Sequence, residues 1–162
     1  MSNHFPVRIK TNILKFALTC IAAGGLSMAG VSPAVAQPKP DKALAAAAKE
    51  PGAKVTASGL VILMVKEGKG PQPVATSTVK VHYKGMFPDG REFDSSYSRG
   101  EPIEFPLNGV IKCWTEGVAL MKVGGAARLT CPSSVAYGTR GAGGVIPPNA
   151  TLVFEVVLLG VR

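Results

Sequence analysis

Only one stretch of the chain after about residue 58 carries apolar residues at helical spacing, and this limits the fold more than any other feature. Apolar side chains recur every three or four positions in residues 110–121, which predicts an amphipathic helix. Gly124 and Gly125 follow, as is typical of a helix end. The apolar positions are Ile111, Trp114, Val118 and Met121. Such a helix must bury its apolar face against other elements, and the remaining sequence indicates strands.

Short runs of β-branched and apolar residues lie on both sides of this helix. Residues 78–84 alternate apolar and polar side chains, as a half-buried strand does. Residues 87–90, Phe-Pro-Asp-Gly, are typical of a turn. The predicted strands are residues 59–65, 78–84, 91–94, 102–107, 126–131 and 151–159. We therefore predict an α+β domain, in which an antiparallel β-sheet wraps around a single short α-helix.

The first 36 residues have the pattern of a secretory signal peptide. Three basic residues precede an uncharged stretch over residues 16–36, which ends in the small-x-small site Ala34-Val35-Ala36. We predict cleavage after Ala36, export to the periplasm and no stable membrane insertion after cleavage. A membrane-spanning helix is the alternative, because the stretch is long enough, but its glycines and Pro33 weaken it. Thr19 disfavours a lipoprotein anchor at Cys20.

Residues 37–57 follow as a segment in which prolines and Gly52 surround an alanine-rich patch. One or two helical turns over residues 42–50 are marginal on their own. We predict a flexible leader here, followed by one domain over residues 58–162.

Charge and cysteine content narrow the class of protein further. Loss of the signal's three basic residues lowers the formal charge from +8 to +5, and no dense run of lysine and arginine remains, which argues against nucleic-acid binding. Cys113 and Cys131 are the two cysteines after residue 36. An oxidising compartment favours a disulfide between them, and two buried free thiols are the alternative.

The sequence after residue 36 lacks the usual groups of covalent, metal or nucleotide chemistry. Its one histidine, His82, stands in a predicted strand with no partner residues. There is no Gly-x-Ser-x-Gly motif, no cysteine and histidine spacing for a metal, and no lysine after the glycines of residues 141–144. We therefore predict no metal and no cofactor.

Six groups of residues between residue 58 and the C-terminus stand in a fixed order and spacing. They are Val81–Met86, Asp89-Gly90, Phe93–Ser96, Val110-Ile111 with Trp114–Gly117, Ala136–Gly138, and Ile146–Leu152 with Phe154–Val156. In this order they resemble the FKBP-type peptidyl-prolyl cis-trans isomerases. One such group alone is weak, but six in register are specific.

The resemblance implies a pocket between sheet and helix that aromatic side chains line. Asp94 would lie at the pocket wall, with Arg99 as a structural partner of this acid and of Tyr83. Trp114 would form the floor, and a flap would run over residues 137–147. By resemblance, the catalytic residues are Asp94, Tyr137, Phe93 and Trp114, and the substrate-binding residues are Tyr83, Phe105, Val110, Ile111, Val145, Ile146 and Phe154. From spacing alone, most of these would be ordinary core residues.

The implied activity is rotation about X–Pro bonds, without a cofactor. The implied partners are proline-containing unfolded or exported polypeptides and macrolide inhibitors of the immunosuppressant class. A leader this short has no room for a helical dimerisation arm, which favours a monomer. Two departures concern Cys113, where many members have a smaller residue, and the flap over residues 139–144. The alternatives are a chaperone-like peptide-binding module without turnover and a structural envelope protein held by an uncleaved signal.

Overall fold

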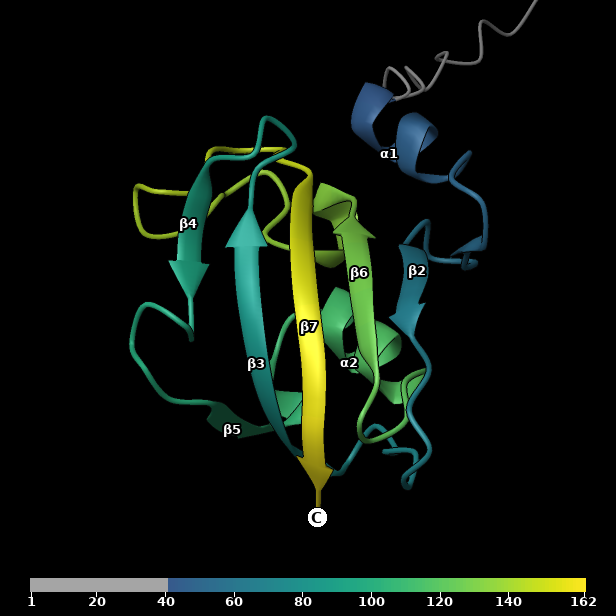
Figure 1. Cartoon of the computed structure of the whole chain (residues 1–162). Coiled ribbons are helices and arrows are strands. Elements are labelled where there is room, and N and C mark those ends of the chain that lie inside the picture. Colours follow the sequence, from purple (N-terminus) through teal and green to yellow (C-terminus); the bar gives the residue numbers. More distant parts are fainter. Residues whose placement is uncertain (1–40) are drawn as a thin grey trace, which may run out of the picture. The chain divides into compact units, whose positions relative to one another are not determined.

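A seven-stranded antiparallel sheet is the frame of the described residues, 41–162, in a computed structural model (Figure 1). The strand order is β1-β2-β6-β7-β3-β4, and β5 pairs with β3 beyond this path. The strands are β1 (Ala53–Val55), β2 (Val61–Lys66), β3 (Thr78–Met86), β4 (Glu92–Ser95), β5 (Ile103–Pro106), β6 (Ala126–Cys131) and β7 (Leu152–Val161). The predicted signal peptide lies outside the described residues.

The two long central strands, β3 and β7, alternate buried and accessible side chains. Val79, Val81 and Tyr83 of β3 point to the inner face of the sheet and are buried, whereas Lys80 between them is exposed. In β7, Phe154 and Val156 are buried and Glu155 is exposed. This period of two is what a sheet with one covered face requires.

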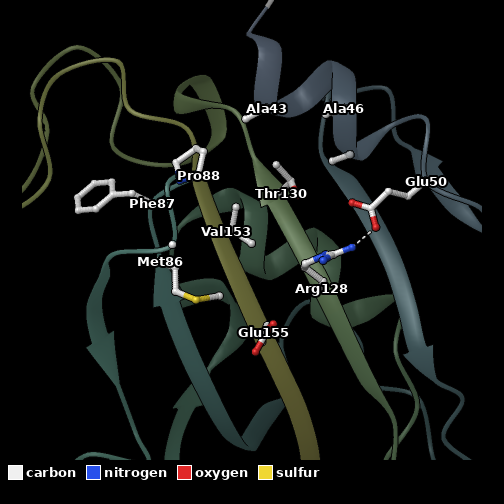
Figure 2. A pocket seen from close by; sticks show the side chains of 12 residues that line it. Ala43, Ala46, Glu50, Met86, Phe87, Pro88, Arg128, Thr130, Val153 and Glu155 are labelled. Atoms are coloured by element: carbon white, nitrogen blue, oxygen red, sulfur yellow. Dashed lines mark hydrogen bonds and ion pairs between the residues drawn. The ribbon is translucent and has the colours of Figure 1, made fainter.

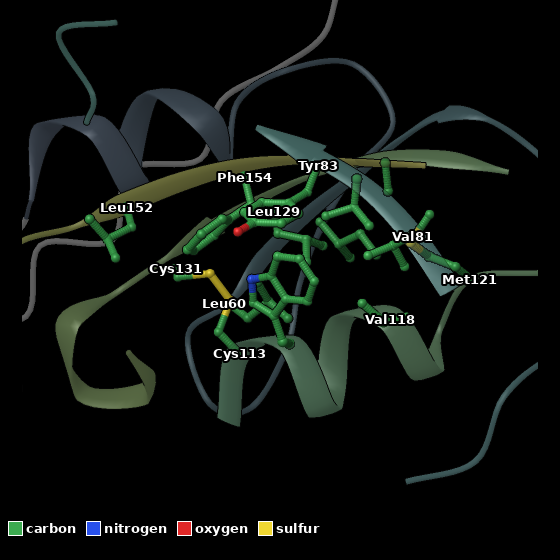
Figure 3. Close-up of a cluster of buried hydrophobic side chains, with 14 of the residues drawn as sticks. Leu60, Val81, Tyr83, Cys113, Val118, Met121, Leu129, Cys131, Leu152 and Phe154 are labelled. Atoms are coloured by element: carbon green, nitrogen blue, oxygen red, sulfur yellow. A yellow bond between two sulfur atoms is a disulfide. The ribbon is translucent and has the colours of Figure 1, made fainter. Parts of the chain in front are cut away.

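Helix α2 (Lys112–Ala119) covers the inner face and buries Cys113, Trp114, Gly117 and Val118. Gly117 permits this close approach, since a Cβ atom there would lie 2.8 Å from the Leu129 side chain of β6. Figure 3 shows the resulting core, in which side chains of the sheet meet the helix. The expected α+β architecture with one main helix against an antiparallel sheet is confirmed.

Residues 42–57 differ from the expected flexible leader. They contain helix α1 (Lys42–Ala47) and strand β1, which pairs with β2. The Asp41 carboxylate caps α1 by accepting the Ala43 N–H at 2.9 Å, and it also accepts the Thr151 hydroxyl. Glu50 forms an ion pair with Arg128 of β6. These contacts with residues far along the chain stabilise a helix that is too short to be stable alone.

No helix within residues 41–162 has the length and apolar content needed to cross a membrane.

Two single 3₁₀ turns, η1 (Leu107–Gly109) and η2 (Ser133–Val135), complete the fold. The first leads directly into α2, and the second leads into the loop that begins at Tyr137.

Candidate substrate-binding pocket

A pocket of about 510 Å³ is lined by side chains of β3, β4, β5, β7 and α2 and by Tyr137. Its volume is within the range of sites that hold small organic groups. The lining is mostly apolar and aromatic, with one carboxylate. The lining residues are Tyr83, Phe93, Asp94, Ile103, Phe105, Gly109, Val110, Ile111, Trp114, Tyr137 and Phe154.

The Trp114 indole is the centre of an aromatic cluster at the base of the pocket. Its ring centroid lies 5.1 Å from Tyr83 and 5.4 Å from Phe154, both edge to face, and 5.2 Å from Phe105 in a tilted arrangement. Phe93 packs edge to face on Phe154 at 5.7 Å. Such pairs add stabilisation beyond the apolar area they bury, so the rings hold one another in place around the pocket.

Gly85 of β3 leaves the space in which the Phe93 ring lies. A Cβ atom at residue 85 would be 2.7 Å from Phe93 Cζ and 3.1 Å from Phe154 Cε1. Gly85 is also the register partner of Phe154 on one side and of Asp94 on the other. The absence of a side chain at this point therefore allows the wall of the pocket to form.

Asp94, Tyr83 and Arg99 form a hydrogen-bonded polar cluster at the pocket wall. Arg99 contacts the Asp94 carboxylate at 2.6 Å and donates to the Tyr83 hydroxyl at 2.9 Å, and this hydroxyl donates to Asp94. Burial opposes the charge on Asp94, but the hydrogen bonds from Tyr83 and Arg99 outweigh it and lower the pKa of Asp94. Burial and the Asp94 bond raise the pKa of Tyr83. Asp94 therefore stays a carboxylate at neutral pH.

The lowered pKa of Asp94 predicts a pH dependence of stability. A carboxyl group whose pKa is lower in the folded state stabilises the fold above its unfolded value and loses this stabilisation as the pH falls through the folded value. Asp94→Asn removes the ionisable group. We expect the stability difference between the wild type and Asp94→Asn to shrink as the pH is lowered from neutral to below 3.8, the ordinary value.

Urea unfolding at a series of pH values measures this difference. Glu101→Gln is the control, because Glu101 is exposed and makes no ion pair within residues 41–162. A difference in the free energy of unfolding between wild type and Asp94→Asn that stays constant from neutral to acid pH would contradict the assigned hydrogen bonds.

Tyr137 closes the pocket at the start of the flap and is 37% exposed. Its hydroxyl makes no hydrogen bond to another described residue, so it is available to a ligand. Burial, and next the charge of Asp94, raise the pKa of Tyr137. Tyr137 therefore offers a neutral hydroxyl at the pocket rim.

The contact of Val145 and Ile146 with a ligand, expected from the resemblance, stays a prediction. Neither is among the pocket-lining residues. The flap folds back on itself through a bridge between Ala142 and Ile146, with Ile146 N–H donating to the Ala142 carbonyl at 2.9 Å. This turn leaves Val145 58% exposed and places Ile146 in the buried core cluster.

The structure brings together every other pocket residue named from the sequence, and it adds two. Ile103 and Gly109 also line the pocket. Ile103 stands two positions before Phe105 in β5, so alternation along that strand could have identified it. Gly109 contributes only backbone and carries no side-chain signal.

Cys113 and Cys131 form a disulfide. The sequence alone did not decide between this bond and two buried free thiols.

A second, smaller hollow of about 270 Å³ lies between α1, the end of β3 and residues of β6 and β7 (Figure 2). Alanines of α1, Phe87 and Pro88 line this hollow. Its charged residues Glu50 and Arg128 form an ion pair with each other. It lacks the converging aromatic rings of the first pocket. No group of residues within 41–162 could hold a metal ion.

The fold provides an aromatic pocket that is suited to a small apolar group of a ligand. The Asp94 carboxylate and the Tyr137 hydroxyl lie at its rim. The sequence profile of FKBP-type peptidyl-prolyl cis-trans isomerase matches residues 70–159. This chain therefore belongs to the FKBP-type peptidyl-prolyl cis-trans isomerase family.

Named relatives agree with this assignment. The chain is 54% identical over 126 residues to the FKBP-type peptidyl-prolyl cis-trans isomerase FkpA of Aeromonas hydrophila, covering 78% of this chain and 47% of that protein. It is 55% identical over 103 residues to FK506-binding protein 1 of Dictyostelium discoideum, covering 62% of this chain and 96% of that protein. The chain thus spans about half the length of the FkpA relatives.

Solved structures share the fold. The crystal structure of FkpA from Escherichia coli matches with a TM-score of 0.71 and 50% identity, over 74% of this chain and 55% of that chain. A peptidyl-prolyl cis-trans isomerase from Pseudomonas syringae matches with a TM-score of 0.70 and 40% identity, over 74% and 88% of the two chains.

Proposed function

We propose that this protein catalyses cis–trans isomerisation of X–Pro bonds in exported polypeptides. The observation that carries the proposal is the pocket with Trp114 at its base and Asp94 and Tyr137 at its rim. Family membership supports the same reaction. The signal-peptide pattern of residues 1–36 supports export, and we propose the periplasm as the compartment and Ala36 as the last residue removed.

The reaction requires no bond to be made or broken. Amide resonance gives a rotational barrier of about 18–20 kcal/mol, and uncatalysed X–Pro exchange takes tens to hundreds of seconds. In the twisted transition state the conjugation is lost and the carbonyl is less polar than in the planar amide. An apolar, water-poor pocket therefore disfavours the planar state more than the twisted state, which lowers the barrier.

The residues of the pocket take distinct parts in this mechanism. The proline ring packs on Trp114, between Phe93 and Phe154. The free hydroxyl of Tyr137 donates a hydrogen bond to the backbone of the substrate. Asp94, fixed by Tyr83 and Arg99, keeps the wall rigid and presents a negative charge at the rim. A macrolide of the immunosuppressant class competes for the same apolar space.

The matched pair Tyr137→Phe and Tyr97→Phe tests this function, since each removes one hydroxyl. Tyr97 is 52% exposed, stacks on His82 and does not line the pocket. We expect the wild type to accelerate isomerisation of a Leu-Pro peptide in a protease-coupled assay. Loss of one hydrogen bond should lower kcat/KM about threefold to tenfold in Tyr137→Phe and leave Tyr97→Phe unchanged.

The same assay separates the rival functions. Wild-type protein that suppresses aggregation of an unfolded client but does not accelerate isomerisation would identify a peptide-binding module instead. N-terminal sequencing of the exported protein tests the compartment: a start at Gln37 supports cleavage, and a start at Met1 supports a retained anchor.

A further inference from the structure

The first turn of α2 lacks the contacts that usually hold a helix start. Ile111 occupies the N-cap position and provides no side-chain hydrogen bond, and the first turn has no acidic residue. The helix has only eight residues and contains Gly117, so its intrinsic stability is low. Contacts with the rest of the fold must therefore hold Trp114, the third residue of this helix, in place.

The aromatic rings around Trp114 and a hydrogen bond from the Thr115 hydroxyl to the Leu107 carbonyl, at 2.5 Å, provide part of this hold. Two contacts with one face of β6 add to it. Gly117 packs directly on Leu129, and one turn earlier Cys113 is bonded to Cys131, with the Cα atoms 5.9 Å apart (Figure 3). Residues four apart on a helix are separated by about 6 Å along its axis. Residues two apart on a strand are separated by about 7 Å. The two pairs therefore match in spacing, and the disulfide fixes the turn that carries Trp114.

The other end of the disulfide leads to the flap. Cys131 ends β6, and the chain reaches Tyr137 through η2. This segment is tightly folded, because Gly138 N–H donates to the Ser133 carbonyl at 2.8 Å. The disulfide thus joins, through short and ordered segments, the residue at the base of the pocket and the residue at its rim.

We infer that the disulfide between Cys113 and Cys131 is a positioning element of the pocket, which sets the separation between Trp114 and Tyr137. Both cysteines are fully buried, and neither lines the pocket, so they act through the residues they hold. This inference rests on the proposed function and deepens it: an oxidising compartment then completes the binding site as well as the fold.

The double variant C113A/C131A tests the inference through two readouts that loss of stability alone does not change. The first is KM for a Leu-Pro peptide. We expect kcat/KM to fall about tenfold, carried by a rise in KM, because a displaced Trp114 and Tyr137 would bind the peptide less tightly. The second is the line width of the indole N–H resonance in an NMR spectrum, which can be assigned at once because Trp114 is the only tryptophan. We expect this resonance to broaden, because the indole loses its fixed position; a change of chemical shift alone would follow from the new neighbour at residue 113.

Leu158→Ala is the control, because Leu158 is fully buried but does not line the pocket. It should lower the unfolding midpoint while KM and the indole resonance stay as in the wild type. All proteins are measured at a temperature at which they are folded. C113A/C131V, which fills more of the vacated space, replaces the double alanine variant should that variant not fold.

A cross-link-free protein with a wild-type KM and a wild-type indole line width overturns the inference and leaves the disulfide a stabilising role alone. Failure of the proposed function is a different result, in which the wild type itself does not accelerate isomerisation. In that case the affinity for the Leu-Pro peptide, measured by titration of the indole resonance, still decides whether the disulfide positions the pocket.

Discussion

Replacing Trp114 by alanine is expected to have the largest combined effect on stability and activity. The indole is 5% exposed and contacts three aromatic rings. Truncation of a buried tryptophan lowers the free energy of unfolding by about 3–5 kcal/mol. The three neighbouring rings lose their common partner, so kcat/KM should also fall by at least about tenfold.

Met121→Ala separates the two effects. Met121 is fully buried just beyond the end of α2 but does not line the pocket. Its truncation should lower the free energy of unfolding by about 2–5 kcal/mol with kcat/KM retained below the unfolding transition. Chemical denaturation and the peptide assay measure both quantities. Equal activity losses in the two variants would show that Trp114 acts only through stability.

Replacing Gly85 by alanine should push the Phe93 ring toward the pocket and narrow it. The added Cβ atom would lie 2.7 Å from the Phe93 ring, and the Phe154 ring on the other side is already close. Overpacking of this kind lowers stability by about 1–3 kcal/mol. Because the Phe93 ring must move, we expect kcat/KM to fall about tenfold, with most of the loss in KM.

Gly160→Ala is the matched control for the same substitution in the neighbouring strand. A Cβ atom there meets only Lys80 Cβ, at 3.8 Å, which is an ordinary contact. Its stability should stay within about 0.5 kcal/mol of the wild type, and its activity should be unchanged. Wild-type kinetics for Gly85→Ala would mean that Phe93 takes no part in binding.

The bounds of a strand were predictable where a glycine or a proline in the sequence marks its end. Strand β6 has the predicted bounds, residues 126–131, because Gly125 precedes it and Pro132 follows. Strand β1 was missed, since three residues with two exposed side chains show no alternation. Helix α1 is too short for its local sequence to predict a stable helix. Two of the contacts that stabilise it come from Arg128 and Thr151, which lie 78 and 110 residues away from Glu50 and Asp41.

The pocket was predictable for a different reason. No local pattern tells a core aromatic from a pocket aromatic, so Trp114 and Phe154 were assigned through the family resemblance. The position of Val145 could not be obtained in this way, because it depends on the bridge between Ala142 and Ile146 within the flap. Side-chain direction in such a loop is set by backbone hydrogen bonds that leave no periodic signal.

Strand β7 follows every other strand in the chain, yet it lies between β3 and β6 in the sheet (Figure 1). Until residues 152–161 have been synthesised, no backbone pairing joins β1, β2 and β6 to β3, β4 and β5. The two halves of the sheet therefore join only once β7 is available, so the strand that comes last in this sheet completes the domain.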